Sequence, residues 1–86
     1  MNIYRYRFSA LCPNNGARIY YKLELTHRAM VRVEDIVEAC NGFCQAFHED
    51  IADTLHLAFG GYQVINALHH GVEIETRRGK PIGGVA

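Results

Sequence analysis

Apolar and polar residues alternate strictly over two stretches in the first third of the chain. Residues 1–11 and 17–26 both carry an apolar side chain at every second position. The side chains expected to point inward are Tyr4, Tyr6, Phe8 and Ala10 in the first stretch and Ala17, Ile19, Tyr21, Leu23 and Leu25 in the second. A period of two is typical of a strand with one buried face. Asn15-Gly16 favours a tight turn, so these stretches predict a hairpin.

The apolar period changes to three or four over residues 33–59, which indicates an amphipathic helix. Carboxylates in its first turns complement the helix dipole, and Gly60-Gly61 provides a left-handed stop. The expected inward stripe is Val33, Val37, Cys40, Cys44, Phe47, Ile51, Leu55 and Ala58. Asn41-Gly42 interrupts the helix with a poor helix former, but the stripe stays in register across it. We therefore expect one long helix, bent at this point, with a break into two helices as the alternative.

Two further short strands are expected after the helix, at residues 62–68 and 72–76, joined by a turn at His69-His70-Gly71. In the last strand Val72, Ile74 and Thr76 should face inward, and Glu73 and Glu75 outward. The predicted fold is α+β, with two layers in the order β-β-α-β-β: a four-stranded antiparallel sheet with one long amphipathic helix on one face. The sequence does not fix the order of the strands within the sheet.

Length and composition fit one small domain. The chain has 86 residues, of which 49% are hydrophobic and 21% charged. We expect residues 1–78 to form the domain and residues 79–86, which include three glycines, to form a flexible C-terminal tail. No apolar run approaches the length of a membrane span, and an odd number of cysteines fits reduced thiols, so a cytoplasmic location without membrane contact is expected.

Charge is strongly segregated along a chain whose formal net charge is zero. All nine Lys and Arg residues lie outside residues 33–76, whereas every Asp and Glu except Glu24 lies within that segment. Such asymmetry bears on partners rather than on the fold. A core this small also makes association a plausible source of extra stability.

The outer face of the sheet is expected to be basic and to contain an exposed aromatic ring. Single-stranded nucleic acids are often held by such surfaces, through phosphate neutralisation and base stacking. The candidate residues are Arg5, Arg7, Arg18, Tyr20 and Lys22. The simpler interpretation is that Glu73 and Glu75 lie beside Arg5 and Arg7 and neutralise them, which depends on the order of the strands.

The polar face of the helix is acidic and lacks basic residues within helical reach. Such a face suits a basic protein partner, including the sheet face of a second copy in a homodimer, although a solvated acidic face is an equally simple interpretation. The candidate partner-binding residues are Glu34, Glu38, Glu49, Asp50 and Asp53.

Cys40, Cys44 and His48 recur one helical turn apart, a spacing at which side chains can share a zinc ion. The two cysteines lie on the apolar stripe, so we interpret them as small core residues and predict neither a metal nor a cofactor. His69 and His70 could serve as a general base, but no candidate nucleophile lies near them in the sequence, and exposure in the turn is the simpler interpretation.

Phe8-Ser9-Ala10 and Glu75-Thr76 resemble fragments of the 6-pyruvoyltetrahydropterin synthases, whose fold also begins and ends with paired strands. The resemblance covers five residues. It implies a zinc-dependent pterin enzyme with Glu75 as the one transferable site residue. The zinc-binding His-x-His segment of that family is replaced here by Gly16-Ala17-Arg18-Ile19, so the chemistry is not carried over.

The sequence therefore favours a small non-enzymatic protein-interaction module, an adaptor or inhibitor that acts through an acidic helix face and a basic sheet face. Single-stranded nucleic-acid binding is the alternative, and a metal-dependent or pterin-type enzyme ranks third.

Overall fold

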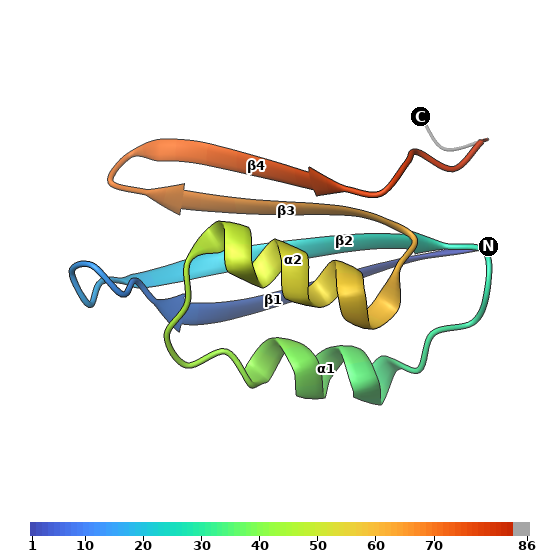
Figure 1. Ribbon diagram of the computed structural model, residues 1–86, viewed down its shortest axis with the longest axis horizontal. Helices are drawn as coiled ribbons and strands as arrows, with labels where there is room; N and C mark the ends of the chain where they lie inside the picture. Colours follow the sequence, from blue (N-terminus) through green and yellow to red (C-terminus); the bar gives the residue numbers. More distant parts are fainter. Residues whose placement is uncertain (84–86) are drawn as a thin grey trace.

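The computed structural model describes residues 1–83 as a sheet with helices on one face (Figure 1). The elements, in chain order, are β1 (Asn2–Leu11), β2 (Arg18–His27), α1 (Val33–Asn41), α2 (His48–Phe59), β3 (Tyr62–His69) and β4 (Val72–Arg78). The order is thus β-β-α-α-β-β, and the predicted α+β class with a four-stranded antiparallel sheet is confirmed.

The strands lie in the sheet in the order of the sequence, β1-β2-β3-β4, and each neighbouring pair is antiparallel. The two hairpins are closed by the turns that the sequence predicts, with positive φ at Gly16 and at His70-Gly71. Because β1 and β4 occupy opposite edges, Glu73 and Glu75 do not lie beside Arg5 and Arg7. The expected neutralisation of these arginines by β4 within one chain therefore does not occur.

The helical segment forms two helices rather than the single long helix expected. Residues 42–47 leave the helix and dock on the end of β1, where Leu11 N donates to Cys44 O at 3.0 Å and Ala46 N donates to Leu11 O at 3.1 Å. These sheet-like bonds satisfy backbone groups that a continuous helix would have bonded internally. The break falls at Asn41-Gly42, the position that the sequence marks as weak.

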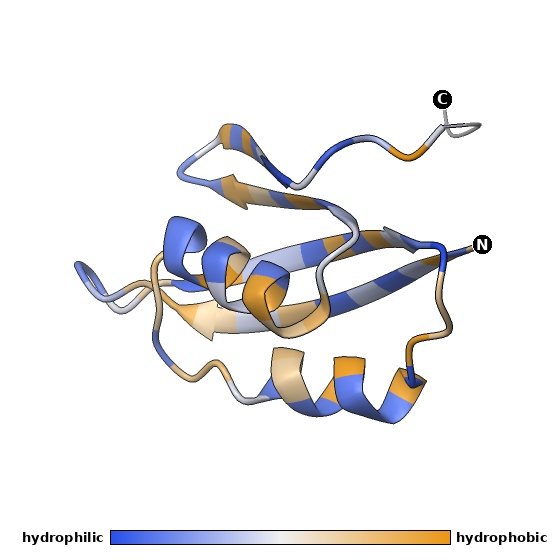
Figure 2. Ribbon diagram, turned by 45° about the vertical axis from the view of Figure 1, so that its right-hand side comes forward, coloured by the Kyte–Doolittle hydropathy of each residue, from blue (hydrophilic) through white to orange (hydrophobic). Residues whose placement is uncertain are grey.

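The core lies between the sheet and the two helices. Figure 2 shows hydrophobic and hydrophilic residues alternating along the strands and along both helices. The fully buried apolar residues are Leu23, Leu25, Cys40, Ile51 and Leu55 at 0%, with Ala10, Ala52 and Ile65 at 1%. The break shifts the stripe in the residues that follow it, and Phe47, expected inward, is 45% exposed; Val33, expected inward at the start of α1, is 58% exposed. Cys44 and Ala58 are exposed as well.

The end of α2 is fixed against β3 and the start of the tail. Gln63 is buried and donates through Nε2 to Leu55 O at 3.0 Å and to Gly60 O at 2.8 Å, which caps the helix. Gly61 and Gly79 pack backbone to backbone, and a Cβ on Gly79 would lie 2.1 Å from Gly61 O. The predicted flexible tail thus begins at a packed glycine, and its last residues, 84–86, lie outside the described part of the chain.

Within residues 1–83, neither helix is long and apolar enough to cross a membrane.

Candidate active site

One cavity of about 290 Å³ opens between the sheet and the start of α2. Its polar lining comes from four separate places: the turn after β1, the strands β2 and β3, and the first turn of α2. The chemically active side chains in its wall are Cys12, Tyr21, His48, Glu49 and His69. Residues distant in the sequence thus meet at one cavity beneath the helix layer.

Cys12 is held at the cavity by a tightly bonded turn. Its backbone N donates to Ala17 O at 2.8 Å, and its carbonyl accepts from Gly16 N at 2.8 Å. Asn15 Oδ1 also accepts from Ala17 N at 2.9 Å. The thiol is free and its side chain is 5% exposed, so this turn fixes a buried sulfur in the cavity wall.

His48 is the first residue of α2, and its ring stands edge-on to Tyr21 with centroids 5.2 Å apart at 86°. Phe8 stacks on the same tyrosine at 5.3 Å, which holds its ring in place. Burial lowers the pKa of His48 below its ordinary value of 6.5. The nearby Ile65 backbone acts in the opposite direction, but burial is the larger effect. His48 is therefore neutral at pH 7 and can either accept or donate a proton.

Buried polar atoms without partners collect around this cavity. Within residues 1–83, Tyr21 Oη, both ring nitrogens of His48 and His69 Nε2 are buried without a hydrogen bond, and the fifth such atom is Gln63 Oε1. Unpaired buried polar atoms are costly, so each needs an explanation such as a catalytic role or a bound ligand, ion or water. Burial raises the pKa of Tyr21, and Cys12 acts in the same direction, so the phenol remains a donor.

Glu49 adds a carboxylate to the rim of the cavity, where Arg78 at the end of β4 holds it. The Arg78 guanidinium bonds Glu49 Oε2 through Nη2 and Asp53 Oδ1 through Nε, the latter at 2.8 Å. Hydrogen bonds to Asp53 and then to Glu49 raise the pKa of Arg78. The end of β4 and the first turns of α2 are thereby tied together beside the cavity.

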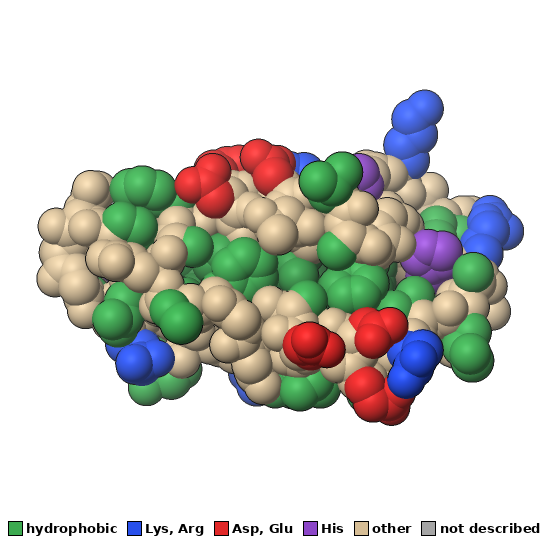
Figure 3. Space-filling model, turned by 60° about the horizontal axis from the view of Figure 1, so that its bottom comes forward, with side chains coloured by type: hydrophobic (Ala, Val, Ile, Leu, Met, Phe, Trp, Pro, Cys, Tyr) green, Lys and Arg blue, Asp and Glu red, His purple; other side chains and the backbone are tan. Residues whose placement is uncertain are grey.

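The predicted acidic partner-binding residues lie on both helices, and some of them pair with arginines. Figure 3 shows acidic side chains in groups on this side of the molecule, with hydrophobic side chains exposed between them. Glu34 pairs with Arg32 at 3.5 Å, while Glu49 and Asp53 share Arg78. Glu38 and Asp50 are exposed and form no ion pair within residues 1–83.

The predicted basic residues lie together on the sheet face that carries no helix. Arg5 pairs with its cross-strand neighbour Glu24 at 2.9 Å, and Arg18 donates to Ser9 Oγ at 2.9 Å. Arg7 and Lys22 are direct cross-strand partners of the same charge, and neither forms an ion pair within residues 1–83. Tyr20 is 71% exposed on this face.

The helix cysteines do not join His48 in a metal site. Cys40 is in the core, where burial raises the pKa of its thiol to about 12, whereas Cys44 is exposed. In the part of the chain that the structure describes, no group of three His, Cys, Asp or Glu side chains could hold a metal ion.

The residues that resemble pterin synthases do not converge on the cavity. Glu75 lies exposed on the outer sheet face and pairs with Arg77 at 2.6 Å. Ser9 lies on that same face and accepts its hydrogen bond from Arg18.

The cavity was not predicted from the sequence. From the sequence alone, His48 is considered as a metal ligand, Glu49 as a partner contact, and His69 as a general base or an exposed turn residue. Tyr21 is assigned only to the inward face of its strand, and Cys12 has no chemical role. A cysteine directly before a Pro-Asn-Asn-Gly turn, and a His-Glu pair opening a helix, are the signals that could have found it. The His-Glu pair can be used as a signal only once it is known that α2 starts at His48.

No family model matches the sequence, and no curated protein is significantly similar to it. Among solved structures, the fold is similar to that in the crystal structure of the archaeosine synthase QueF-Like in the apo form, with a TM-score of 0.64. The match covers 93% of this chain and 95% of that one, at 18% sequence identity. The similarity therefore extends over the whole fold, and at 18% identity it establishes the fold alone.

This finding corrects the functional prediction. The chain was expected to be a non-enzymatic adaptor or inhibitor, whereas its fold matches that of a synthase along nearly its full length. The expectation relied on the absence of converging chemically active groups in the sequence, whereas in the structure Cys12, Tyr21 and His48 line one cavity.

Proposed function

We propose that this protein is an enzyme that acts on a nucleobase or nucleoside through a covalent bond to Cys12. The observation that carries the proposal is the convergence of a free thiol, a neutral histidine and a tyrosine with unpaired polar atoms on one cavity. The shared fold with an archaeosine synthase supports the substrate class, since archaeosine is a modified nucleoside.

Cys12 supplies the nucleophile. A thiolate adds to an unsaturated carbon of the substrate, and the π electrons of that carbon move to the neighbouring heteroatom, which takes up a proton. The proton that leaves the sulfur needs an acceptor close by. The neutral ring of His48 lines the same cavity and can take that proton or return it to the substrate. The backbone hydrogen bonds of the turn around Cys12 hold this residue, and with it the sulfur, in position at the cavity.

Glu49 and Tyr21 supply recognition. A carboxylate accepts two parallel N–H donors, such as those on the edge of an amino-substituted purine. Arg78 holds Glu49 at the rim, so the acceptor is oriented before the substrate arrives. Tyr21 keeps its proton and can donate to a ring nitrogen or a carbonyl oxygen.

Cysteine alkylation followed by intact-protein and peptide mass spectrometry tests this proposal, and the chain contains its own controls. Exposed Cys44 serves as the reference thiol, and core Cys40 as the inert one. We expect bromoacetamide to modify Cys12, and guanosine at millimolar concentration to slow that modification several-fold without changing the rate at Cys44. Glu49→Gln should abolish the protection and leave the rate at Cys44 unchanged.

A Cys12 that no base or nucleoside protects would contradict the proposed substrate class. A Cys12 that bromoacetamide does not modify in the folded protein would contradict its role as the nucleophile. Asp50→Asn is the matched control for Glu49→Gln, because Asp50 is the next residue of α2 and does not line the cavity.

A further inference from the structure

His69 lines the cavity of Cys12 and His48, but the proposed function gives it no part. It ends β3, where the alternation that buries Ile65 and Ala67 also turns its side chain toward the helix layer. Its Nε2 atom is buried and has no hydrogen bond within residues 1–83. A buried ring nitrogen without a partner is costly, so this atom is available to a ligand in the cavity.

The ring of His69 is held by its neighbour in the turn. His70 has a positive φ of 51°, and its ring lies against that of His69 with centroids 4.4 Å apart and planes tilted by 32°. Asn15 contacts Nε2 of His70 through its side-chain nitrogen at 3.0 Å. The other contact of Asn15 fixes the orientation of its amide, because Oδ1 accepts from Ala17 N at 2.9 Å and Nδ2 is left to donate to His70. The ring that supports His69 is therefore itself hydrogen-bonded in place.

This hydrogen bond joins the two turns that border the cavity. Asn15 belongs to the turn whose backbone bonds hold Cys12, and His70 belongs to the turn that follows His69. His69 is thereby positioned on the Cys12 side of the cavity, whereas Glu49 reaches the cavity from the first turn of α2. Two polar contacts, one from the sheet and one from the helix layer, can orient a planar ring between them.

We propose that His69 contacts the substrate, with Nε2 donating a hydrogen bond to the heteroatom beside the carbon that Cys12 attacks. This role rests on the proposed function and adds to it a recognition group from the sheet. The base is then bound at two edges, because Glu49 accepts from N–H donors and His69 donates to an acceptor atom. The heteroatom gains electron density when the sulfur adds, so a donor at this position binds it more strongly as the bond forms.

Protection of Cys12 from bromoacetamide by guanosine tests this role in two variants. His69→Phe keeps a ring against His70 and removes the nitrogen, and it should raise the guanosine concentration for half-protection about tenfold or more. His69→Gln places an amide near the position of Nε2, so guanosine should protect it within about threefold of the wild type. Without nucleoside, the alkylation rates of Cys12 and Cys44 should be the same in all three proteins.

Inosine separates a lost contact from a disturbed cavity, because inosine lacks the amino group from which Glu49 is proposed to accept. His69→Phe should weaken protection by inosine and by guanosine by the same factor. Leu68→Phe is the matched control, since Leu68 precedes His69 on β3, is 61% exposed and does not line this cavity. Its protection should equal that of the wild type. Circular dichroism shows whether each variant is folded, and His69→Leu tests the same loss with a smaller side chain if the phenylalanine variant does not fold.

Full protection of His69→Phe by guanosine would overturn the role of His69 and leave the proposed function intact. Equal weakening in the phenylalanine and glutamine variants would also overturn it, because the polar atom would then have no effect. So would a changed ratio of guanosine to inosine protection in His69→Phe, since the variant would then act through Glu49. A wild-type Cys12 that guanosine does not protect would contradict the proposed function itself, and with it the role of His69.

Discussion

Both ring nitrogens of His48 are buried without a hydrogen bond, and this state makes the folded protein sensitive to acid. Burial lowers the pKa of His48 in the folded state, whereas in the unfolded chain it returns to about 6.5. Below that pH the unfolded chain therefore binds a proton that the folded one does not. Stability from this residue is present at neutral pH and falls as the pH decreases through 6.5 toward the lowered value.

Replacing His48 with Gln should remove this contribution. We expect the urea-unfolding free energy of the wild type to fall more steeply between pH 7 and pH 5 than that of His48→Gln. The control is His70→Gln, because His70 is exposed and hydrogen-bonded to Asn15 in the hairpin turns. Parallel pH profiles for the wild type and His48→Gln would show that the His48 ring is not buried as the structure places it.

At the scale of elements, α2 is positioned by the face that it buries. Leu55 is 0% exposed against the sheet, while Phe47, at the N-cap of α2, is 45% exposed and borders the cavity. Leu55→Ala should cost about 2 to 5 kcal/mol of unfolding free energy. Phe47→Ala should cost about 1 to 2 kcal/mol, because half of its ring is already in water. Chemical denaturation measures both losses. A larger loss for Phe47→Ala than for Leu55→Ala would contradict this placement of α2 on the sheet.

The break between the helices is set by tertiary bonds more than by the glycine. Gly42 has φ −75° and ψ −16°, which alanine adopts readily, and a Cβ there would meet backbone atoms only at 3.4 Å. The bonds of residues 42–47 to Leu11 compete with a continuous helix. Gly42→Ala should therefore leave the helical circular dichroism unchanged and alter stability by about 1 kcal/mol or less. A rise in helicity by one or more turns would show that Gly42 alone ends α1.

The strands could be predicted closely, because alternation along each strand reports directly which face is buried. The helix break could not be placed, since the bonds that cause it join residues 44 and 46 to Leu11, far away in the sequence. The cavity was missed for the same reason. Cys12, His48 and His69 are isolated from one another along the chain, and only the sheet order brings their elements together. The order of the strands, which the sequence does not fix, also determines which arginines lie beside a carboxylate.

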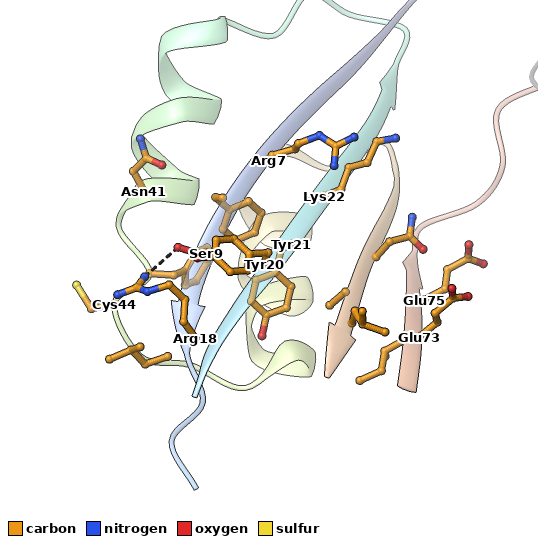
Figure 4. Close-up of a pocket in the computed structure, with 17 residues that line it drawn as sticks. Arg7, Ser9, Arg18, Tyr20, Tyr21, Lys22, Asn41, Cys44, Glu73 and Glu75 are labelled. Atoms are coloured by element: carbon orange, nitrogen blue, oxygen red, sulfur yellow. Dashed lines mark hydrogen bonds between the residues drawn. The ribbon is translucent and has the colours of Figure 1, made fainter. Parts of the chain in front are cut away.

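At the scale of the whole molecule, the uneven distribution of charge over the sheet should make stability depend on salt. The core is apolar, so its contribution changes little with ionic strength. Arg7 and Lys22, in contrast, face each other across β1 and β2 on a solvated face, as Figure 4 shows. Screening shortens the reach of such charges from about 10 Å at 0.1 M salt to about 3 Å at 1 M.

Like charges directly opposite each other destabilise a sheet, so Arg7→Gln should raise the thermal midpoint at about 0.05 M NaCl by removing the repulsion between Arg7 and Lys22. Raising NaCl to about 0.5 M should shrink the difference between this variant and the wild type, because salt already screens the repulsion in the wild type. Differential scanning fluorimetry at several salt concentrations measures both midpoints. A difference that stays constant with salt would show that the repulsion between these two side chains does not lower the stability of the fold.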